Sequence, residues 1–147
     1  RTAHGSTLSW VVHAWVLARA RRLQAWDLFR KALNSDFTDI QGGTTPEGIH
    51  LGAMAGTVDL VQRCFTGIEA RGDALHLDPV LPDGLAGLRT RVRFRGHRIE
   101  LAVDHREVRV TSRRATAPPV TVVYRGHARQ LSPGEHYRFR LVHPPGL

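Results

Sequence analysis

The first residues of the chain are of types that bind phosphate. His4, Gly5, Ser6 and Thr7 directly precede a long apolar run that predicts a helix. Ser6 or Thr7 would cap that helix, because a hydroxyl oxygen there accepts a hydrogen bond from an otherwise unpaired backbone N–H. The remaining N–H groups and the positive end of the helix dipole favour phosphate or another anion. On the residues alone, a plain helix cap is the alternative to an anion site.

Three helices are predicted in the first half of the chain. Apolar residues fill nearly every position of 8–20, an i, i+3, i+4 stripe marks 23–34, and a loop over 35–47 precedes a third helix over 48–69. A helix that is apolar on all sides must be buried on all sides, and two neighbours cannot surround it. We therefore expect further helices, from a second copy of the chain or from a longer polypeptide. The absence of an initiator Met favours the longer polypeptide.

After Gly72 the hydrophobic period becomes two, which predicts β-strands with one solvated and one buried face. In residues 89–95, arginines alternate with Thr, Val and Phe. The tetrapeptides FRGH at 94–97 and YRGH at 124–127 each predict a turn that joins two strands. Short strands at this spacing predict an antiparallel sandwich or jelly roll. The alternating arginines are interpreted as a solvated face, with a binding stripe as the alternative.

The two patterns together predict an α+β chain with two parts. Residues 1–72 form the helical part, and residues 73–147 form a connector and a β-sandwich. The segment 75–82 is predicted as an extended connector between the two parts, because a floppy linker would be polar and rich in glycine or serine. Its leucines and valine are expected to pack the two parts together.

Composition argues against several classes of function. The net charge of +8 is compatible with nucleic-acid binding, but the arginines are spread along the chain instead of clustering in a recognisable module. Cys64 is the single cysteine, which excludes an internal disulfide, and the nine histidines lack paired ligand spacing. No apolar run reaches about 18 residues, the length needed to span a membrane. We therefore expect no metal, no nucleic acid and no membrane partner.

The opening motif and the segment QGGTTPEGIHLGAMAGT at 41–57 resemble motifs of glycoside hydrolase family 65. The segment DALHLDPVLP at 73–82 and the two tetrapeptides resemble the C-terminal part of the same family. That family contains inverting phosphorylases of α-linked disaccharides such as maltose, trehalose, kojibiose and nigerose, and some hydrolases. The resemblance implies the last helices of an (α/α)6 catalytic barrel in residues 1–72. It implies a jelly-roll-like C-terminal β-sandwich in residues 73–147.

The chemistry that this resemblance implies is inverting phosphorolysis. A Glu general acid protonates the glycosidic oxygen while inorganic phosphate attacks the anomeric carbon from the opposite face. Phosphate takes the place of the water in an inverting hydrolase, and it needs no general base because it is already anionic. The family's general acid lies upstream of this chain, so no residue here is assigned as catalytic. We expect the chain to be inactive alone.

The resemblance also assigns phosphate contacts to residues of this chain. Ser6 and Thr7 match the family's paired-hydroxyl phosphate site, and Thr7 retains a hydroxyl where many relatives carry a second Ser. His50 matches a second phosphate-side position, with a hydrogen-bonded buried histidine as the alternative. Four further residues are candidates for lining the same site: His4, Thr44, Thr45 and Glu47.

The implied substrates are an α-linked disaccharide and inorganic phosphate, with no other cofactor. The family is also cytoplasmic and commonly homo-oligomeric. One alternative function is a trehalase-like hydrolase of the same family. Another is a stand-alone β-sandwich that binds sugar or has a structural role. The choice of disaccharide is not encoded in these residues, because the family's acceptor-selecting loops lie outside them.

Overall fold

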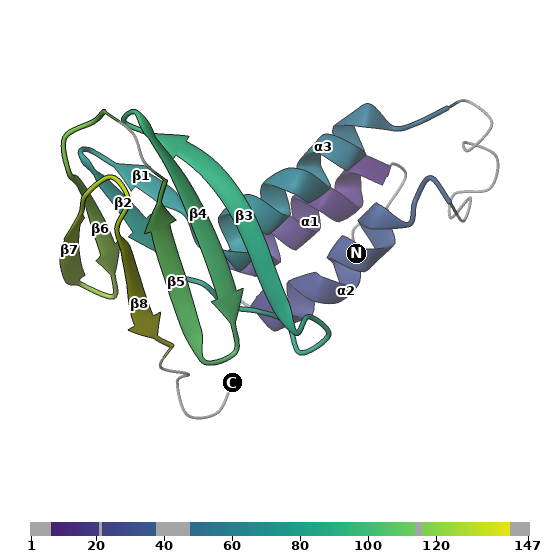
Figure 1. The fold of residues 1–147 in the computed structure, drawn as a ribbon. Helices are drawn as coiled ribbons and strands as arrows, with labels where there is room; N and C mark the ends of the chain where they lie inside the picture. The colour runs from purple at the N-terminus through teal and green to yellow at the C-terminus, as the bar shows by residue number, and fades with distance from the viewer. Residues whose placement is uncertain (1–6, 21, 38–47, 114–115, 142–147) are drawn as a thin grey trace. The chain divides into compact units, whose positions relative to one another are not determined.

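A computed structural model describes residues 7–20, 22–37, 48–113 and 116–141 (Figure 1). The chain forms two compact units, residues 1–65 and 66–147. The boundary lies earlier than the division at residues 72/73 expected from the sequence. That division would have split a pair of hydrogen-bonded strands, β1 (Glu69–Arg71) and β2 (Ala74–Leu77).

The helical unit contains α1 (Thr7–Ala20), α2 (Arg22–Leu33) and α3 (Leu51–Asp59). A π-helical segment, Leu60–Phe65, continues α3. The first two helices were predicted to within one residue at each end. The third was predicted to run to Glu69, which is wrong, because Glu69 already belongs to β1.

Gly67 explains why the helix cannot continue. Its φ is +61°, in the left-handed region that favours glycine, and a Cβ there would overlap the backbone of Asp78. The chain therefore turns sharply between the helical segment and the first strand, and only glycine fits at the turn.

Burial of α1 within this chain is one-sided, in agreement with the expectation that two neighbouring helices cannot surround it. Ala14 and Ala18 are buried, whereas Val12 and Val16 are 52% and 59% exposed. The buried side packs with α2 and α3. The rings of Trp26 and Phe29 on α2 and of Phe65 in the π-helical segment form an aromatic cluster. Within the described residues, the helical unit thus leaves one apolar face of α1 uncovered.

The second unit is a two-layer β-sandwich. Its sheets have the orders β1-β2-β6-β7 and β3-β4-β5-β8, and all neighbours are antiparallel except β2 and β6. The other strands are β3 (Gly87–Phe94), β4 (His97–Asp104), β5 (Glu107–Ser112), β6 (Val120–Tyr124), β7 (His127–Leu131) and β8 (His136–Arg140).

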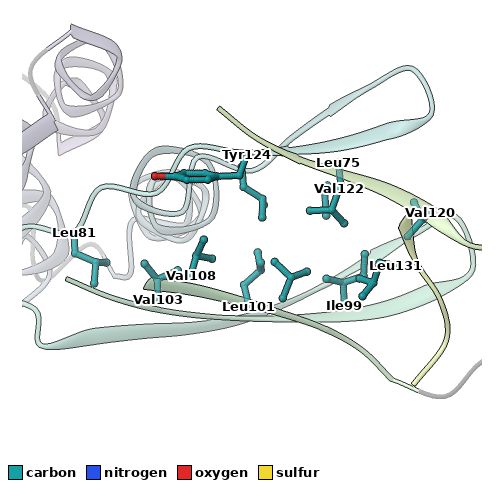
Figure 2. Close-up of a cluster of buried hydrophobic side chains, with 12 residues drawn as sticks. Leu75, Leu81, Ile99, Leu101, Val103, Val108, Val120, Val122, Tyr124 and Leu131 are labelled. Atoms are coloured by element: carbon teal, nitrogen blue, oxygen red, sulfur yellow. The ribbon is translucent and has the colours of Figure 1, made fainter. Parts of the chain in front are cut away.

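Apolar side chains from both sheets meet in one core (Figure 2). Val120 and Val122 of β6 face Ile99 and Leu101 of β4 across the layer. Burying side chains of this size contributes roughly 1.5–3 kcal/mol each. The alternation predicted for β3 is confirmed, since its residues are alternately exposed and half-buried along the whole strand.

The predicted connector at 75–82 is partly a strand, which corrects the sequence interpretation. Residues Ala74–Leu77 form β2, which pairs with β1 and, in parallel, with β6. Leu75 and Leu77 are buried in the sandwich core. Their apolar character therefore serves the sandwich itself.

The two repeated tetrapeptides form the same hairpin turn. Arg95 and Gly96 have φ of +47° and +80°, and Arg125 and Gly126 have the same two values. Two successive residues with positive φ are the signature of a type I′ turn, whose twist matches that of the flanking strands. The turns join β3 to β4 and β6 to β7, as the sequence predicted. No helix in the described part of the chain is long and apolar enough to cross a membrane.

Candidate functional site

The first turns of α1 and α3 lie side by side. The Leu8 side chain is 3.8 Å from the place where a Cβ on Gly52 would sit. Further along, the indole N–H of Trp15 donates to a carboxylate oxygen of Asp59 at 2.9 Å. The same spacing of 44 residues separates both pairs, so the two helices run parallel and begin at the same end (Figure 1). The positive ends of two helix dipoles are therefore close together.

His50 lies at the start of α3 and is held by Asp36. The ring Nδ1 is 2.6 Å from Asp36 Oδ1, and the His50 backbone N–H donates to Asp36 Oδ2 at 3.2 Å. The side chains are only 26% and 13% exposed. Because a carboxylate can only accept, Nδ1 carries the hydrogen of this bond, and Nε2 is the nitrogen left for another partner.

Asp36 is positioned by the turn that follows α2. Ser35 is buried, and its hydroxyl donates to the carbonyl oxygen of Ala32 at 2.8 Å. The backbone N–H of Phe37 closes the turn on the carbonyl oxygen of Asn34. The turn therefore presents the Asp36 carboxylate to the first residue of α3.

The imidazole of His50 does not cap α3. His50 is the N-cap residue, with φ of −78° and ψ of 79°, but its side chain makes no capping hydrogen bond. Its carbonyl oxygen accepts from the N–H of Met54 at 3.1 Å, as in an ordinary first helical turn. The ring is instead engaged by Asp36, so the His50 side chain satisfies none of the N–H groups in the first turn of α3.

Most residues assigned to the site from the sequence lie outside the described residues. Thr7 is the first residue of α1, although its side chain is among those not described. Five other predicted site residues lie wholly outside the described ranges: His4, Ser6, Thr44, Thr45 and Glu47. The phosphate contacts of these residues remain predictions.

One residue of the site was missed in the sequence. Asp36 follows the second predicted helix and was read only as part of a loop. A short Ser-Asp pair after a helix is common in turns, and nothing in its local spacing links it to a histidine 14 residues later. The structure brings the two together, so Asp36 joins His50 in the candidate site.

Two family models match the chain. The glycosyl hydrolase family 65 central catalytic domain matches residues 1–59, and the C-terminal domain of the same family matches residues 68–131. The helical unit and the sandwich therefore correspond to two different domains of that family.

Curated relatives cover nearly all of the chain. A glycosyl hydrolase of Mycobacterium tuberculosis is 50% identical over 134 residues, which are 91% of this chain and 10% of that protein. Trehalose 6-phosphate phosphorylase of Lactococcus lactis is 35% identical over 142 residues, which are 96% of this chain and 18% of the relative. The chain thus spans between a tenth and a fifth of the length of these relatives.

A solved structure shares the fold. A putative kojibiose phosphorylase from the human microbiome superposes with a TM-score of 0.81 at 23% identity. The match covers 96% of this chain and 19% of that one. The same order of helices followed by two sheets therefore occurs as part of that longer structure.

Proposed function

Because the chain belongs to glycoside hydrolase family 65, we propose that it supplies the phosphate-binding side of an inverting α-glucoside phosphorylase. Phosphorylases of trehalose, trehalose 6-phosphate and glucosylglycerol are among its relatives. The main observation behind the proposal is that α1 and α3 begin side by side, with His50 held by Asp36 at the start of α3.

In this proposal, phosphate lies where α1 and α3 begin. The hydroxyls of Ser6 and Thr7 donate to two phosphate oxygens from the start of α1. Protonated His50 donates from Nε2 to a third oxygen, while its Nδ1–H remains on Asp36. Three donors from two helices would hold the anion in line with the anomeric carbon, which lowers the entropic part of the barrier.

The reaction also needs a proton donor for the leaving sugar. That group is a Glu of the catalytic barrel outside this chain, so the chain contributes binding and orientation of phosphate. As phosphate attacks, the bond between the anomeric carbon and the glycosidic oxygen breaks, and the Glu proton passes to that oxygen. The product is a sugar 1-phosphate of inverted configuration.

The proposal also covers the substrates, the cellular location and the assembly of the whole protein. Its substrates are an α-linked disaccharide and inorganic phosphate, it works in the cytoplasm, and it assembles as a homo-oligomer. A hydrolase of the same family is the alternative. The paired hydroxyls at Ser6 and Thr7 favour the phosphorylase, because a water nucleophile needs a general base there rather than two hydrogen-bond donors.

The test uses the whole protein that carries this chain. Trehalose, trehalose 6-phosphate, maltose, kojibiose and glucosylglycerol are supplied with and without phosphate, and the products are measured. We expect a sugar 1-phosphate to form from one of them only when phosphate is present. Release of free glucose at the same rate without phosphate would show that the protein is a hydrolase. The 147-residue chain alone serves as the inactive control.

A further inference from the structure

The edge strand β7 of the β-sandwich carries polar residues at positions that face the apolar core. Along β6, the core-facing residues Val122 and Tyr124 are buried. Their partners on β7 are Arg129 and His127. Residues directly opposite on antiparallel strands share a face, so Arg129 and His127 lie on the core-facing side of the edge strand. Both are nevertheless exposed, which shows that the sandwich is open at this edge.

The facing edge strand, β8, contributes aromatic rings. Phe139 pairs with Val108 and Tyr137 pairs with Val110, and both valines are buried in the core. Tyr137 and Phe139 are therefore on the core-facing side of the other sheet, where they are half-buried. The Phe139 ring lies 5.5 Å from that of Tyr124, so the two sheets meet through these rings.

A hollow of about 300 Å³ lies between these two strands. Tyr124, Tyr137 and Phe139 line it with aromatic surface, and Arg125, His127 and Arg129 line it with nitrogen donors. This volume is at the lower end of the range for small-molecule sites, about 300–1,000 Å³. It is large enough for one monosaccharide.

The hollow has an uncompensated positive charge. Its described lining contains four arginines and no carboxylate; Arg138 and Arg140 alternate with the core-facing Tyr137 and Phe139, so they lie on the outer face of β8. Arg138 lies 3.8 Å from Glu107, a long ion pair. Arg125, Arg129 and Arg140 form no ion pair with any described residue; Arg125 instead lies over the Tyr124 ring, at 5.8 Å. Guanidinium groups bind phosphate and carboxylate through two parallel hydrogen bonds, so this lining favours an anion.

We propose that the hollow between β7 and β8 binds a phosphorylated monosaccharide. The sugar ring packs on the aromatic side chains of β8, and the phosphate accepts hydrogen bonds from Arg129 and Arg125. The site lies wholly within the sandwich unit, so it is separate from the residues that the proposed function uses. It gives the C-terminal unit a ligand of its own.

A protective role is the competing explanation for these charges. Charged side chains that point inward on an edge strand prevent it from pairing with another chain. That role needs only one charged residue on β7, and it does not require aromatic residues on β8. It predicts self-association when Arg129 is neutralised and no affinity for any sugar phosphate.

The experiment is an NMR titration of the isotope-labelled 147-residue chain with glucose 6-phosphate, glucose and inorganic phosphate in turn. We expect glucose 6-phosphate to shift the amide signals of Gly126 and Ala128 with a millimolar or tighter dissociation constant. Glucose and phosphate are each expected to bind at least fivefold more weakly, because each engages only half of the lining. Raising the salt concentration should weaken the binding of glucose 6-phosphate.

Variants decide between the explanations. Arg129→Gln should weaken binding of glucose 6-phosphate at least fivefold, and Tyr137→Leu should bring its affinity down to that of phosphate. Arg93→Gln is the matched control, since Arg93 is an exposed arginine on β3, another edge strand. Its affinity should equal that of the wild type. No shifts at the β6–β7 turn, or equal affinity for phosphate and the sugar phosphate, would overturn the proposal.

The result does not depend on the phosphorylase proposal. His50→Gln removes a residue of the helical site and should leave the shifts at Gly126 unchanged. If the whole protein proves to be a hydrolase, the titration of the sandwich still stands. If the titration fails, the phosphate site on the helices is unaffected.

Discussion

Asp36 binds His50 through both carboxylate oxygens. One oxygen is 2.6 Å from the ring Nδ1, and the other accepts from the backbone N–H of the same residue at 3.2 Å. The carboxylate thereby fixes the ring relative to the start of α3, because one anchor is on the helix backbone and the other is on the ring. This double contact makes Asp36 the residue that positions the His50 ring.

Replacing Asp36 tests whether this orientation matters for phosphate. The two contacts use different oxygens of Asp36, and in Asp36→Asn one of these positions becomes an NH2 donor, so one of the two contacts is lost. Loss of such supporting contacts typically costs 10- to 100-fold in the analogous case of metal-bound histidines. We expect the KM for phosphate in the whole protein to rise about tenfold, with a smaller change in the KM for the disaccharide.

Two further variants separate orientation from folding. Asp36→Glu keeps both acceptor oxygens and should recover part of the lost phosphate affinity. Asp27→Asn removes an exposed carboxylate of α2 and is the matched control. Initial-rate kinetics with phosphate as the varied substrate would measure all three. An unchanged KM for phosphate in Asp36→Asn would remove Asp36 from the site.

Sequence reasoning found one half of this pair. His50 stands in a motif that resembles the family, whereas Asp36 has no motif of its own and lies across a long loop. Local patterns report on residues within a turn or two of each other. A contact between residues 14 positions apart depends on the path of the loop that connects them. Hydrophobic periodicity carries no information about that path.

The close approach of α1 and α3 can be tested at two glycines of α3. A Cβ on Gly56 would overlap Val11 Cγ1, whereas one on Gly52 would meet Leu8 at an ordinary 3.8 Å. Gly56→Ala should therefore lower the free energy of unfolding by about 1–3 kcal/mol through overpacking. Gly52→Ala should leave it unchanged or raise it by up to about 1 kcal/mol, since alanine favours helix over glycine.

Urea denaturation followed by circular dichroism would measure both variants. The double variant Gly56→Ala with Val11→Ala should recover part of the loss, because the shortened side chain makes room for the new methyl group. Equal stabilities of Gly56→Ala and Gly52→Ala would contradict the parallel packing that places the two helix starts together.

The fold was more predictable than the site, and its failures have local causes. Strands such as β3 and β4 alternate clearly because each has one solvated face. The strand β2 was missed because it is short and followed by Asp78 and prolines, which are typical of a connector. The end of the third helix was missed because Gly67 is required by the approach of Asp78, a contact between distant residues.

His97 links β4 to β5 and to the segment that precedes β6, and its replacement should lower stability. It is fully buried on β4, with Nδ1 at 2.7 Å from Ser112 Oγ and Nε2 at 2.8 Å from the carbonyl oxygen of Pro118. His97→Leu removes both of these hydrogen bonds, although the Ser112 hydroxyl keeps its 3.2 Å bond to the carbonyl oxygen of Arg113 and Pro118 is an exposed residue. A hydrogen bond contributes about 0.5–1.5 kcal/mol net, so we expect a loss of about 1–3 kcal/mol in total.

Ser112→Ala is the comparison for His97→Leu, since it removes one of the two hydrogen bonds and leaves the other intact. It should cost about 1 kcal/mol. Chemical denaturation of both variants, monitored by tryptophan fluorescence and circular dichroism, would provide the two values. A His97→Leu variant as stable as the wild type would show that the ring is only a space-filling side chain.

Acid stability should depend on Asp104 in the turn between β4 and β5. Its Oδ1 accepts the backbone N–H groups of Arg106 at 2.7 Å and Glu107 at 2.8 Å. These hydrogen bonds, the one from Arg106 first, hold the pKa of the carboxyl below its usual value. A carboxyl with a lowered folded pKa stabilises the fold above its unfolded pKa of about 3.9, and the contribution is lost as the pH falls through the folded value.

Asp104→Asn removes this titration and keeps an acceptor oxygen for the turn. The free energy of unfolding of the wild type should fall between about pH 5 and pH 2, and the fall should be smaller in the variant. Urea denaturation at pH steps across that interval measures both curves. If the free energies of unfolding of the wild type and Asp104→Asn change equally with pH, the Asp104 carboxylate is stabilised no more by its hydrogen bonds in the folded chain than by water in the unfolded chain.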